Sequence, residues 1–132
     1  MKTLVLDAHA LMKYFELEPG WDKVAGLLQQ AADEKCLLLL TVVNWGEVFY
    51  MTLQDEGEES AQTVLAAIRQ MPIRLVEANK ELTLAAARFK ARGGISYADC
   101  FAAGLGKLEK AEIVTGDKEF KVVEDEVKIR WM

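Results

Sequence analysis

Four acidic residues occupy positions in the sequence where a carboxylate could do chemistry. They are Asp7, Glu47, Asp99 and Asp117. They are widely separated in the chain, so only the fold can bring them together. Clustered carboxylates repel one another unless a cation neutralises them, and Mg²⁺ or Mn²⁺ prefers oxygen ligands of this kind. If the four acids meet, the sequence predicts a divalent metal site.

Two of these acids follow apolar runs of strand length. Asp7 comes directly after residues 3–6, and Asp117 follows residues 113–115 through Gly116. In a parallel sheet the carboxyl ends of the strands meet at one edge, where ligands bind, so we expect both acids at that edge. Taken alone, Asp7 is better explained as a turn or helix-capping aspartate, and Gly-Asp is a common turn pair.

The other two acids are predicted to lie on helices. Glu47 sits in an apolar helical segment, where an ionised side chain is costly unless it is paired, hydrogen-bonded or bound to a metal. It could instead share a polar stripe with Asn44. Asp99 follows Ser96 at the spacing of a capping box, and this structural role could account for it entirely. One shared metal site would explain all four acids at once.

Such a site is suited to cutting a phosphodiester bond. One bound ion would activate water as the nucleophile, and a second could stabilise the leaving oxygen of an in-line displacement. The net charge of −5 means that an RNA-binding protein of this composition must concentrate its positive charge locally. Arg88, Lys90 and Arg92 are the candidates for contacts with the RNA backbone, and a solvated helix face is the alternative.

His9 is the only histidine in the chain. Its ring could donate to a phosphate or contact a metal-bound water, but a plain helix-start position explains it as well. We therefore leave His9 out of the predicted catalytic set.

The elements that must position these residues alternate between short apolar runs and amphipathic segments. The predicted strands cover residues 3–6, 36–40, 72–76, 111–115 and 127–131, the last at a sheet edge. The predicted helices cover residues 9–17, 21–34, 42–53, 61–70, 79–92 and 96–108. This order predicts an α/β fold with a mostly parallel sheet covered by helices on both faces. The helix over 42–53 is apolar on nearly every side, so we expect it to be covered all round.

Length and composition exclude several classes of protein. The 132 residues fit one domain, residues 1–132, and no run approaches the roughly 18 apolar residues of a membrane span. The N-terminus lacks the long apolar region of a signal peptide, so we expect a cytoplasmic protein. Cys36 and Cys100 have apolar neighbours and no metal-ligand spacing, which predicts reduced core residues.

Four segments of the chain together resemble a known family. They are Leu4-Val5-Leu6-Asp7-Ala8, Val43-Asn44-Trp45-Gly46-Glu47-Val48, Ser96-Tyr97-Ala98-Asp99-Cys100 and Thr115-Gly116-Asp117-Lys118-Glu119-Phe120. In order and separation they resemble the PIN domain, and more narrowly the VapC-like toxin nucleases of type II toxin-antitoxin pairs. The likeness spans the whole chain, and the last two segments in tandem are its most specific part.

The resemblance implies roles for the residues that carry it. The four acids match the family's metal-binding quartet, with Thr115 as a hydroxyl residue that supports the site. The implied protein is a Mg²⁺- or Mn²⁺-dependent endoribonuclease with a three-layer α/β/α fold, often a homodimer. The chain departs from the pattern at His9, where the family more often has Ser, Thr or Asn.

The resemblance also implies a partner. Toxin members of the family are inhibited by a small antitoxin protein that lies in or beside the acidic groove. An exposed apolar groove near Trp45, Phe49 and Tyr50 would suit that partner.

Other acid-pocket α/β proteins remain as alternatives. A phosphatase with an aspartate nucleophile would have a second aspartate where this chain has His9, and a receiver domain would have an adjacent acidic pair. Neither feature is present. Within the resemblance, the alternatives are a non-catalytic PIN-like module that binds RNA or protein, and a housekeeping RNA-processing nuclease.

Overall fold

The computed structural model describes all residues, 1–132, and confirms every predicted strand and helix. The strands are β1 (Lys2–Leu6), β2 (Cys36–Thr41), β3 (Ile73–Val76), β4 (Glu112–Thr115) and β5 (Ile129–Trp131). The helices are α1 (Ala8–Phe15), α2 (Trp21–Ala32), α3 (Val42–Glu56), α4 (Glu58–Arg69), α5 (Lys80–Arg92) and α6 (Tyr97–Glu109). A short 3₁₀ helix, η1 (Lys118–Val123), was not predicted.

The five strands form one sheet in the order β3-β2-β1-β4-β5, and every neighbouring pair is parallel. The prediction of a mostly parallel sheet is therefore confirmed, with β5 at an edge as expected. β1 and β4 are neighbours in this order, so their carboxyl ends lie side by side. Asp7 directly follows the last residue of β1, and Asp117 lies two positions after the last residue of β4.

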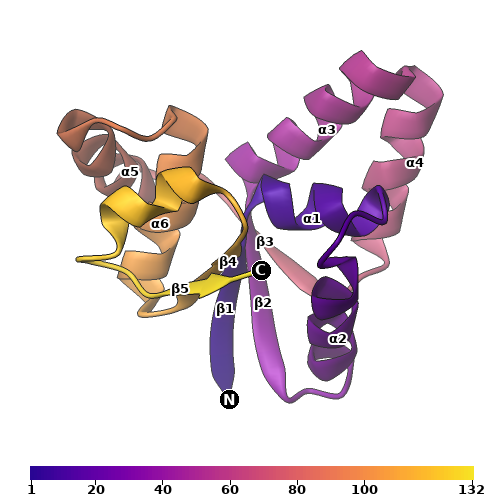
Figure 1. Ribbon diagram of the computed structural model, residues 1–132, viewed down its shortest axis with the longest axis horizontal. Coiled ribbons are helices and arrows are strands. Elements are labelled where there is room, and N and C mark those ends of the chain that lie inside the picture. The colour runs from indigo at the N-terminus through magenta and orange to yellow at the C-terminus, as the bar shows by residue number, and fades with distance from the viewer.

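Alternating side chains of the strands divide the core into two halves. Leu4 and Leu6 pack among buried residues of α1, α2, α3 and α4 on one face of the sheet. Val5, Leu39 and Ile113 pack on the other face, among buried residues of α5, α6 and η1. Figure 1 shows the sheet between these two groups of helices. The fold is thus the three-layer α/β/α sandwich implied by the resemblance.

Helix α3 differs from the prediction, because it is not covered on every side. Its fully buried residues form a single stripe, Asn44, Val48 and Thr52, while Tyr50 and Leu53 are exposed. In Figure 1, α3 and α4 stand out from the sheet as a helical hairpin. The sheet-facing side of α3 and its contact with α4 account for its apolar residues only in part, so the prediction of complete coverage was wrong.

Both cysteines are buried and free, as predicted. No helix combines the length and apolarity that crossing a bilayer requires.

Candidate active site

Asp7 is completely buried where β1 ends and α1 begins. One carboxylate oxygen, Oδ1, accepts the backbone N–H of Ala10 at 2.8 Å, which is the helix-cap role. The other oxygen, Oδ2, accepts the hydroxyl of Thr115. Burial raises the pKa of Asp7 to about 7, although both hydrogen bonds oppose this shift, and the charges of Asp117 and Glu47 raise it further. The helix cap therefore accounts for the hydrogen bond of Oδ1 but not for that of Oδ2.

Thr115 connects two of the acids. Its buried hydroxyl donates to Asp7 and accepts the backbone N–H of Asp117 at 2.9 Å. The Oδ1 atom of Asp117 in turn accepts the N–H of Glu119 at 2.9 Å, which starts η1. One hydroxyl at the end of β4 thus fixes both the carboxylate of Asp7 and the turn that carries Asp117.

Asp99 is buried in the first turn of α6, where Ser96 accepts its backbone N–H at 3.3 Å. The predicted capping interaction exists, but it uses the backbone and leaves the carboxylate free. Burial raises the pKa of Asp99 to about 8, and the charges of Asp117, Asp7 and Glu47 raise it further. Each of the other three predicted acids is therefore close enough to affect Asp99.

Glu47 projects from α3 and is held by Asn44. The Nδ2 group of Asn44 donates to Glu47 Oε1 at 2.8 Å and to the carbonyl oxygen of Ala98 at 3.1 Å. This single amide therefore ties α3 to the first turn of α6. Burial raises the pKa of Glu47, the hydrogen bond from Asn44 lowers it, and the charges of Asp117 and Glu119 raise it. The polar pair predicted with Asn44 exists, but Asn44 is fully buried and does not reach water.

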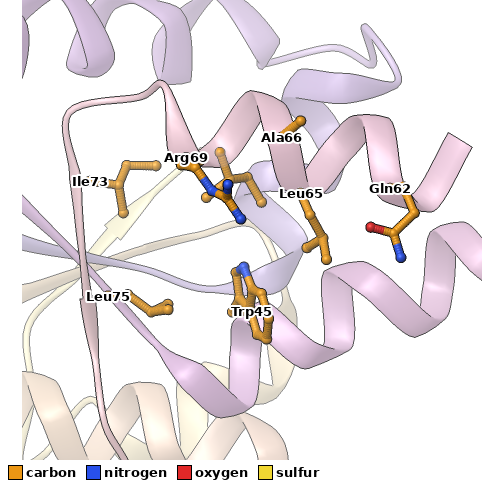
Figure 2. Close-up of a pocket in the computed structure, with 8 residues that line it drawn as sticks. Trp45, Gln62, Leu65, Ala66, Arg69, Ile73 and Leu75 are labelled. Atoms are coloured by element: carbon orange, nitrogen blue, oxygen red, sulfur yellow. The ribbon is translucent and has the colours of Figure 1, made fainter.

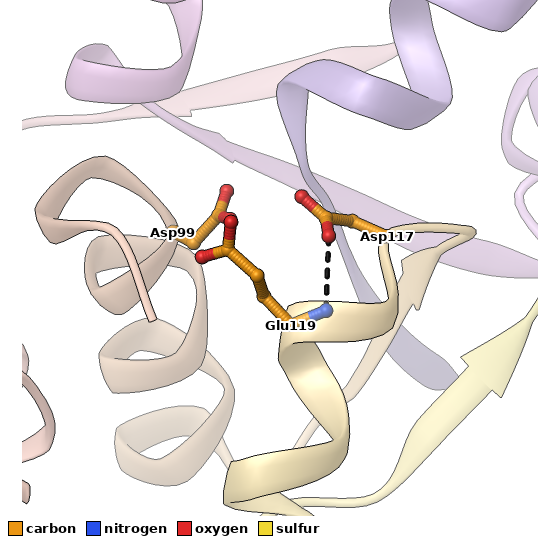
Figure 3. A group of neighbouring side chains, drawn as sticks. All are labelled: Asp99, Asp117 and Glu119. Atoms are coloured by element: carbon orange, nitrogen blue, oxygen red, sulfur yellow. Dashed lines mark hydrogen bonds between the residues drawn. The ribbon is translucent and has the colours of Figure 1, made fainter. Parts of the chain in front are cut away.

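Three of the four predicted acids share one open cavity of about 560 Å³, whereas the fully buried Asp7 does not line it. It is lined by Glu47, Asp99, Asp117 and Glu119, together with Ala8, the residue after Asp7. Oxygens of Asp99, Asp117 and Glu119 all lie within 4.8 Å of one another. Figure 3 shows these three side chains meeting between α6 and the start of η1. This spacing would allow one cation to contact all three.

Glu119 is the site residue that sequence reasoning missed. It lies two positions after Asp117, inside a segment used for the family resemblance, but no role was assigned to it. Its Oε1 atom accepts the backbone N–H of Ser96 at 2.7 Å, so it also joins η1 to the start of α6. The helix η1 was not predicted from the sequence. Had it been, Glu119 would have been expected beside Asp117.

The rest of the cavity lining is also largely acidic. Glu16, Glu18 and Asp55 line the cavity. His9 is the only histidine in the lining, and no lysine or arginine lines it. Burial lowers the pKa of His9, and the nearby charge of Lys13 lowers it further. An anionic ligand would therefore meet a negative cavity unless a cation is bound.

The three predicted RNA-contacting cations do not line this cavity. Arg92 binds the carboxylates of Asp125 and Glu126. Lys90 donates to the backbone carbonyl of Ile95 at 3.0 Å. Arg88 is exposed beside a separate cavity of about 300 Å³, which Arg92 also lines.

An apolar groove of about 650 Å³ lies between α3, α4 and β3. Figure 2 shows the indole of Trp45 on its floor, facing Leu65 and the guanidinium of Arg69 on α4. Of the three aromatic residues predicted beside such a groove, only Trp45 lines it, because Tyr50 faces the acidic cavity. Phe49 lines neither cavity.

Comparison with known proteins agrees with this architecture. Residues 4–126 match the family model of the PIN domain. The fold is similar to that of the VapBC2 structure from Rickettsia felis bound to a DNA fragment from its promoter, with a TM-score of 0.78, 14% identity and 98% of both chains covered. It is also similar to Mycobacterium tuberculosis VapC20, a toxin that cleaves the sarcin-ricin loop, with a TM-score of 0.71, 12% identity, and 91% of this chain and 94% of that chain covered. No curated protein sequence matches the chain.

Proposed function

The chain belongs to the PIN domain family, and from this premise we propose that it is an endoribonuclease that hydrolyses RNA phosphodiester bonds with the help of Mg²⁺ or Mn²⁺. The observation that carries the proposal is the meeting of Asp99, Asp117 and Glu119 within 4.8 Å, with the buried Asp7 near enough for its charge to raise the pKa of Asp99. A purely structural role would not require several carboxylates at one point, because like charges in contact destabilise the fold.

The residues fit a hard divalent cation. The three side chains that meet within 4.8 Å are all carboxylates, and carboxylate oxygens suit Mg²⁺ or Mn²⁺ better than softer metals. Burial and mutual repulsion raise the pKa values of Asp7 and Asp99, so a nearby positive charge would favour their ionised forms. We assign Asp7, Glu47, Asp99 and Asp117 as the metal-holding set and add Glu119. A bound cation of this type activates water and neutralises charge developing on a phosphodiester.

The supporting residues give this acidic set its shape. The hydroxyl of Thr115 fixes one oxygen of Asp7, and the amide of Asn44 fixes one oxygen of Glu47. Asp7 is held through both oxygens, since its Oδ1 atom also accepts the backbone N–H of Ala10, whereas Glu47 is held through Oε1 alone. Since the cavity lining is largely acidic, RNA would be repelled without the cation, so metal is expected to affect RNA binding as well as cleavage.

Positive charge for the RNA backbone must come from outside the cavity. Of the three candidates, Arg88 is the strongest, because its side chain is exposed and has no ion pair with the protein. Arg92 is the weakest, because two carboxylates already neutralise it. We propose that Arg88 and Lys90 contact phosphates and that Arg92 mainly holds the segment around Asp125 in place.

We also propose that the protein is the toxin of a toxin-antitoxin pair, with a cognate antitoxin protein as partner and a homodimer as its assembly. The support is the likeness to solved toxin-antitoxin complexes and the apolar groove lined by Trp45. Growth arrest on induction, relieved by coexpression of a small neighbouring gene, is the expected result. An induced strain that grows normally would favour a housekeeping nuclease.

The direct test of activity is cleavage of structured RNA by purified protein, with and without Mg²⁺ or Mn²⁺. We expect cleavage only with metal and only by the wild type, not by the Asp99→Asn variant. Metal binding without cleavage would favour the non-catalytic PIN-like module. Labelling of the protein by an aryl or acyl phosphate, without RNA cleavage, would favour a phosphatase or receiver domain.

A further inference from the structure

His9 makes a contact that links the start of α1 to the turn after β4. Its Nδ1 atom accepts the backbone N–H of Gly116 at 3.3 Å, across 107 positions of sequence. Gly116 is the residue between Thr115, at the end of β4, and Asp117. The imidazole therefore contacts the backbone immediately before an acid of the cavity.

The ring and the glycine fit closely together. A Cβ atom added at Gly116 would lie 2.9 Å from Cε1 of His9 and 3.3 Å from Nδ1. The backbone of Gly116 does not have a positive φ, so the glycine is not required by its conformation. A methyl group there would press on the ring, and it would also lie 3.3 Å from Cε of Lys13.

Two successive backbone N–H groups of this turn are thus held by side chains from different elements. The N–H of Gly116 is held by His9 on α1, and the N–H of Asp117 is held by Thr115 on β4. Because Nδ1 accepts a hydrogen bond, it carries no proton, and the neutral ring has its N–H at Nε2. No protein group accepts that Nε2–H, and the ring lines the acidic cavity.

We propose that His9 is a positioning residue of the active site: it holds the Gly116–Asp117 turn so that the carboxylate of Asp117 stays beside Asp99 and Glu119. This inference rests on the proposed nuclease function. It assigns a role to the position at which the chain departs from the family pattern, and it fixes the tautomer of the ring.

The first test compares Mn²⁺ affinity among variants by calorimetry. His9→Leu removes the acceptor and should weaken binding by about 10-fold or more, as loss of a group that orients metal ligands does. His9→Asn places an amide oxygen near the position of Nδ1 and should stay within about 3-fold of the wild type on the same grounds. Affinity unchanged in His9→Leu, or equally weak in His9→Asn, would overturn the proposal.

The glycine supplies a matched double variant. Gly116→Ala alone should weaken Mn²⁺ binding, because its methyl group displaces the ring. In the background of His9→Ala the same substitution should cost much less, since the ring is absent and only the flexible side chain of Lys13, with its Cε 3.3 Å from the added carbon, remains nearby. Additive losses from the two single changes would contradict the proposed contact.

The third test does not depend on metal or on activity. Nitrogen NMR of the metal-free protein, at a pH where the His9 ring is neutral, should show its Nε2–H tautomer, and the Nδ1–H tautomer would overturn the proposal. This measurement on the wild type remains decisive even if His9→Leu fails to fold. If the wild type neither binds Mn²⁺ nor cleaves RNA, the nuclease proposal fails, while the tautomer still tests the contact with Gly116.

Discussion

The carboxylate of Asp7 shows how one side chain can satisfy a local rule and a distant requirement together. One oxygen caps α1, as a residue before a helix often does, and the other is held from β4 by Thr115. Complete burial raises the pKa of this group to about 7, so without a cation the uncharged acid is favoured only below about pH 7. A nearby cation would favour the ionised form of Asp7.

Replacing an acid of the site by its amide should separate activity from stability. We expect Asp7→Asn and Asp99→Asn each to lower metal-dependent RNA cleavage by about 100-fold or more, on the scale seen when an electrostatic catalytic group is removed. The unfolding temperature of each variant should match that of the wild type below pH 7. Above pH 7 it should be the same or higher, because a repelling buried charge is lost. The control is Asp33→Asn on the exposed end of α2. Equal cleavage by wild type and variants would indicate a contaminating nuclease.

Thr115→Val should test the hydroxyl that joins Asp7 to the turn of Asp117. The variant keeps the shape of the side chain but leaves buried groups without a partner, so we expect a loss of about 1–3 kcal/mol in the free energy of unfolding. Cleavage should fall about 10- to 100-fold, as with other groups that orient metal ligands. Thr63→Val, on an exposed face of α4, is the matched control. Wild-type cleavage by Thr115→Val would remove Thr115 from the site.

At the residue scale the sequence was informative about the acids and not about their contacts. Asp7 and Asp117 could be placed because parallel strands end at one edge of a sheet. Glu119 could not, because its position depends on η1, which has too little periodicity to predict. The accepting role of His9 depends on the approach of two segments more than 100 positions apart, which no local pattern encodes.

At the scale of elements, α3 and α6 are joined by Asn44. This side chain is buried, bonds with Thr41 at the start of α3, and donates both to Glu47 and to the carbonyl of Ala98. We expect Asn44→Ala to lower the free energy of unfolding by about 1–3 kcal/mol, because buried partners are left unpaired. Cleavage should also fall, since Glu47 loses its only side-chain donor.

Denaturant unfolding and RNA cleavage of Asn44→Ala provide the measurement, with Gln30→Ala on the exposed face of α2 as control. A variant as stable and active as the wild type would show that α3 is positioned by its apolar contacts alone. The apolar pattern of α3 predicted its existence correctly but not its exposure. Such a pattern cannot distinguish contact with the sheet from contact with α4 or with a partner protein.

At the scale of the whole molecule, an all-parallel sheet brings the acids together. The pairing of β1 with β4 sets Asp7 and Asp117 side by side, and the helices that cover the sheet supply Glu47 and Asp99. The sequence predicted this arrangement because alternating strands and helices permit few topologies. The strand order and the open side of the α3–α4 hairpin could not be predicted from the sequence, because they depend on packing between distant segments.

The acidic cavity should make the stability of the metal-free protein depend on pH. The pKa values of Asp7 and Asp99 are about 7 and about 8 in the folded state, above their common ordinary value of 3.8. Between pH 3.8 and these raised values, the folded chain holds more protons than the unfolded chain. The free energy of unfolding therefore falls as pH rises, by about 1.4 kcal/mol per pH unit for each retained proton. Unfolding curves from pH 5 to 8.5 should show this fall.

Metal should reverse the trend, because a cation replaces the protons. Saturating Mn²⁺ is expected to raise the unfolding temperature more at pH 8 than at pH 5.5. The double variant Asp7→Asn, Asp99→Asn should show a weaker dependence on both pH and metal. A wild-type protein whose metal-free stability rises between pH 5 and 8 would contradict these pKa shifts.

The location of a bound ion tests the central claim most directly. Crystals of the wild-type protein soaked in Mn²⁺ should show an anomalous diffraction peak in the acidic cavity, at coordination distance from carboxylate oxygens of Asp99 and Asp117. The same peak should be absent from crystals of Asp99→Asn. Mn²⁺ bound only elsewhere on the protein, with this cavity empty at saturating concentration, would contradict the account.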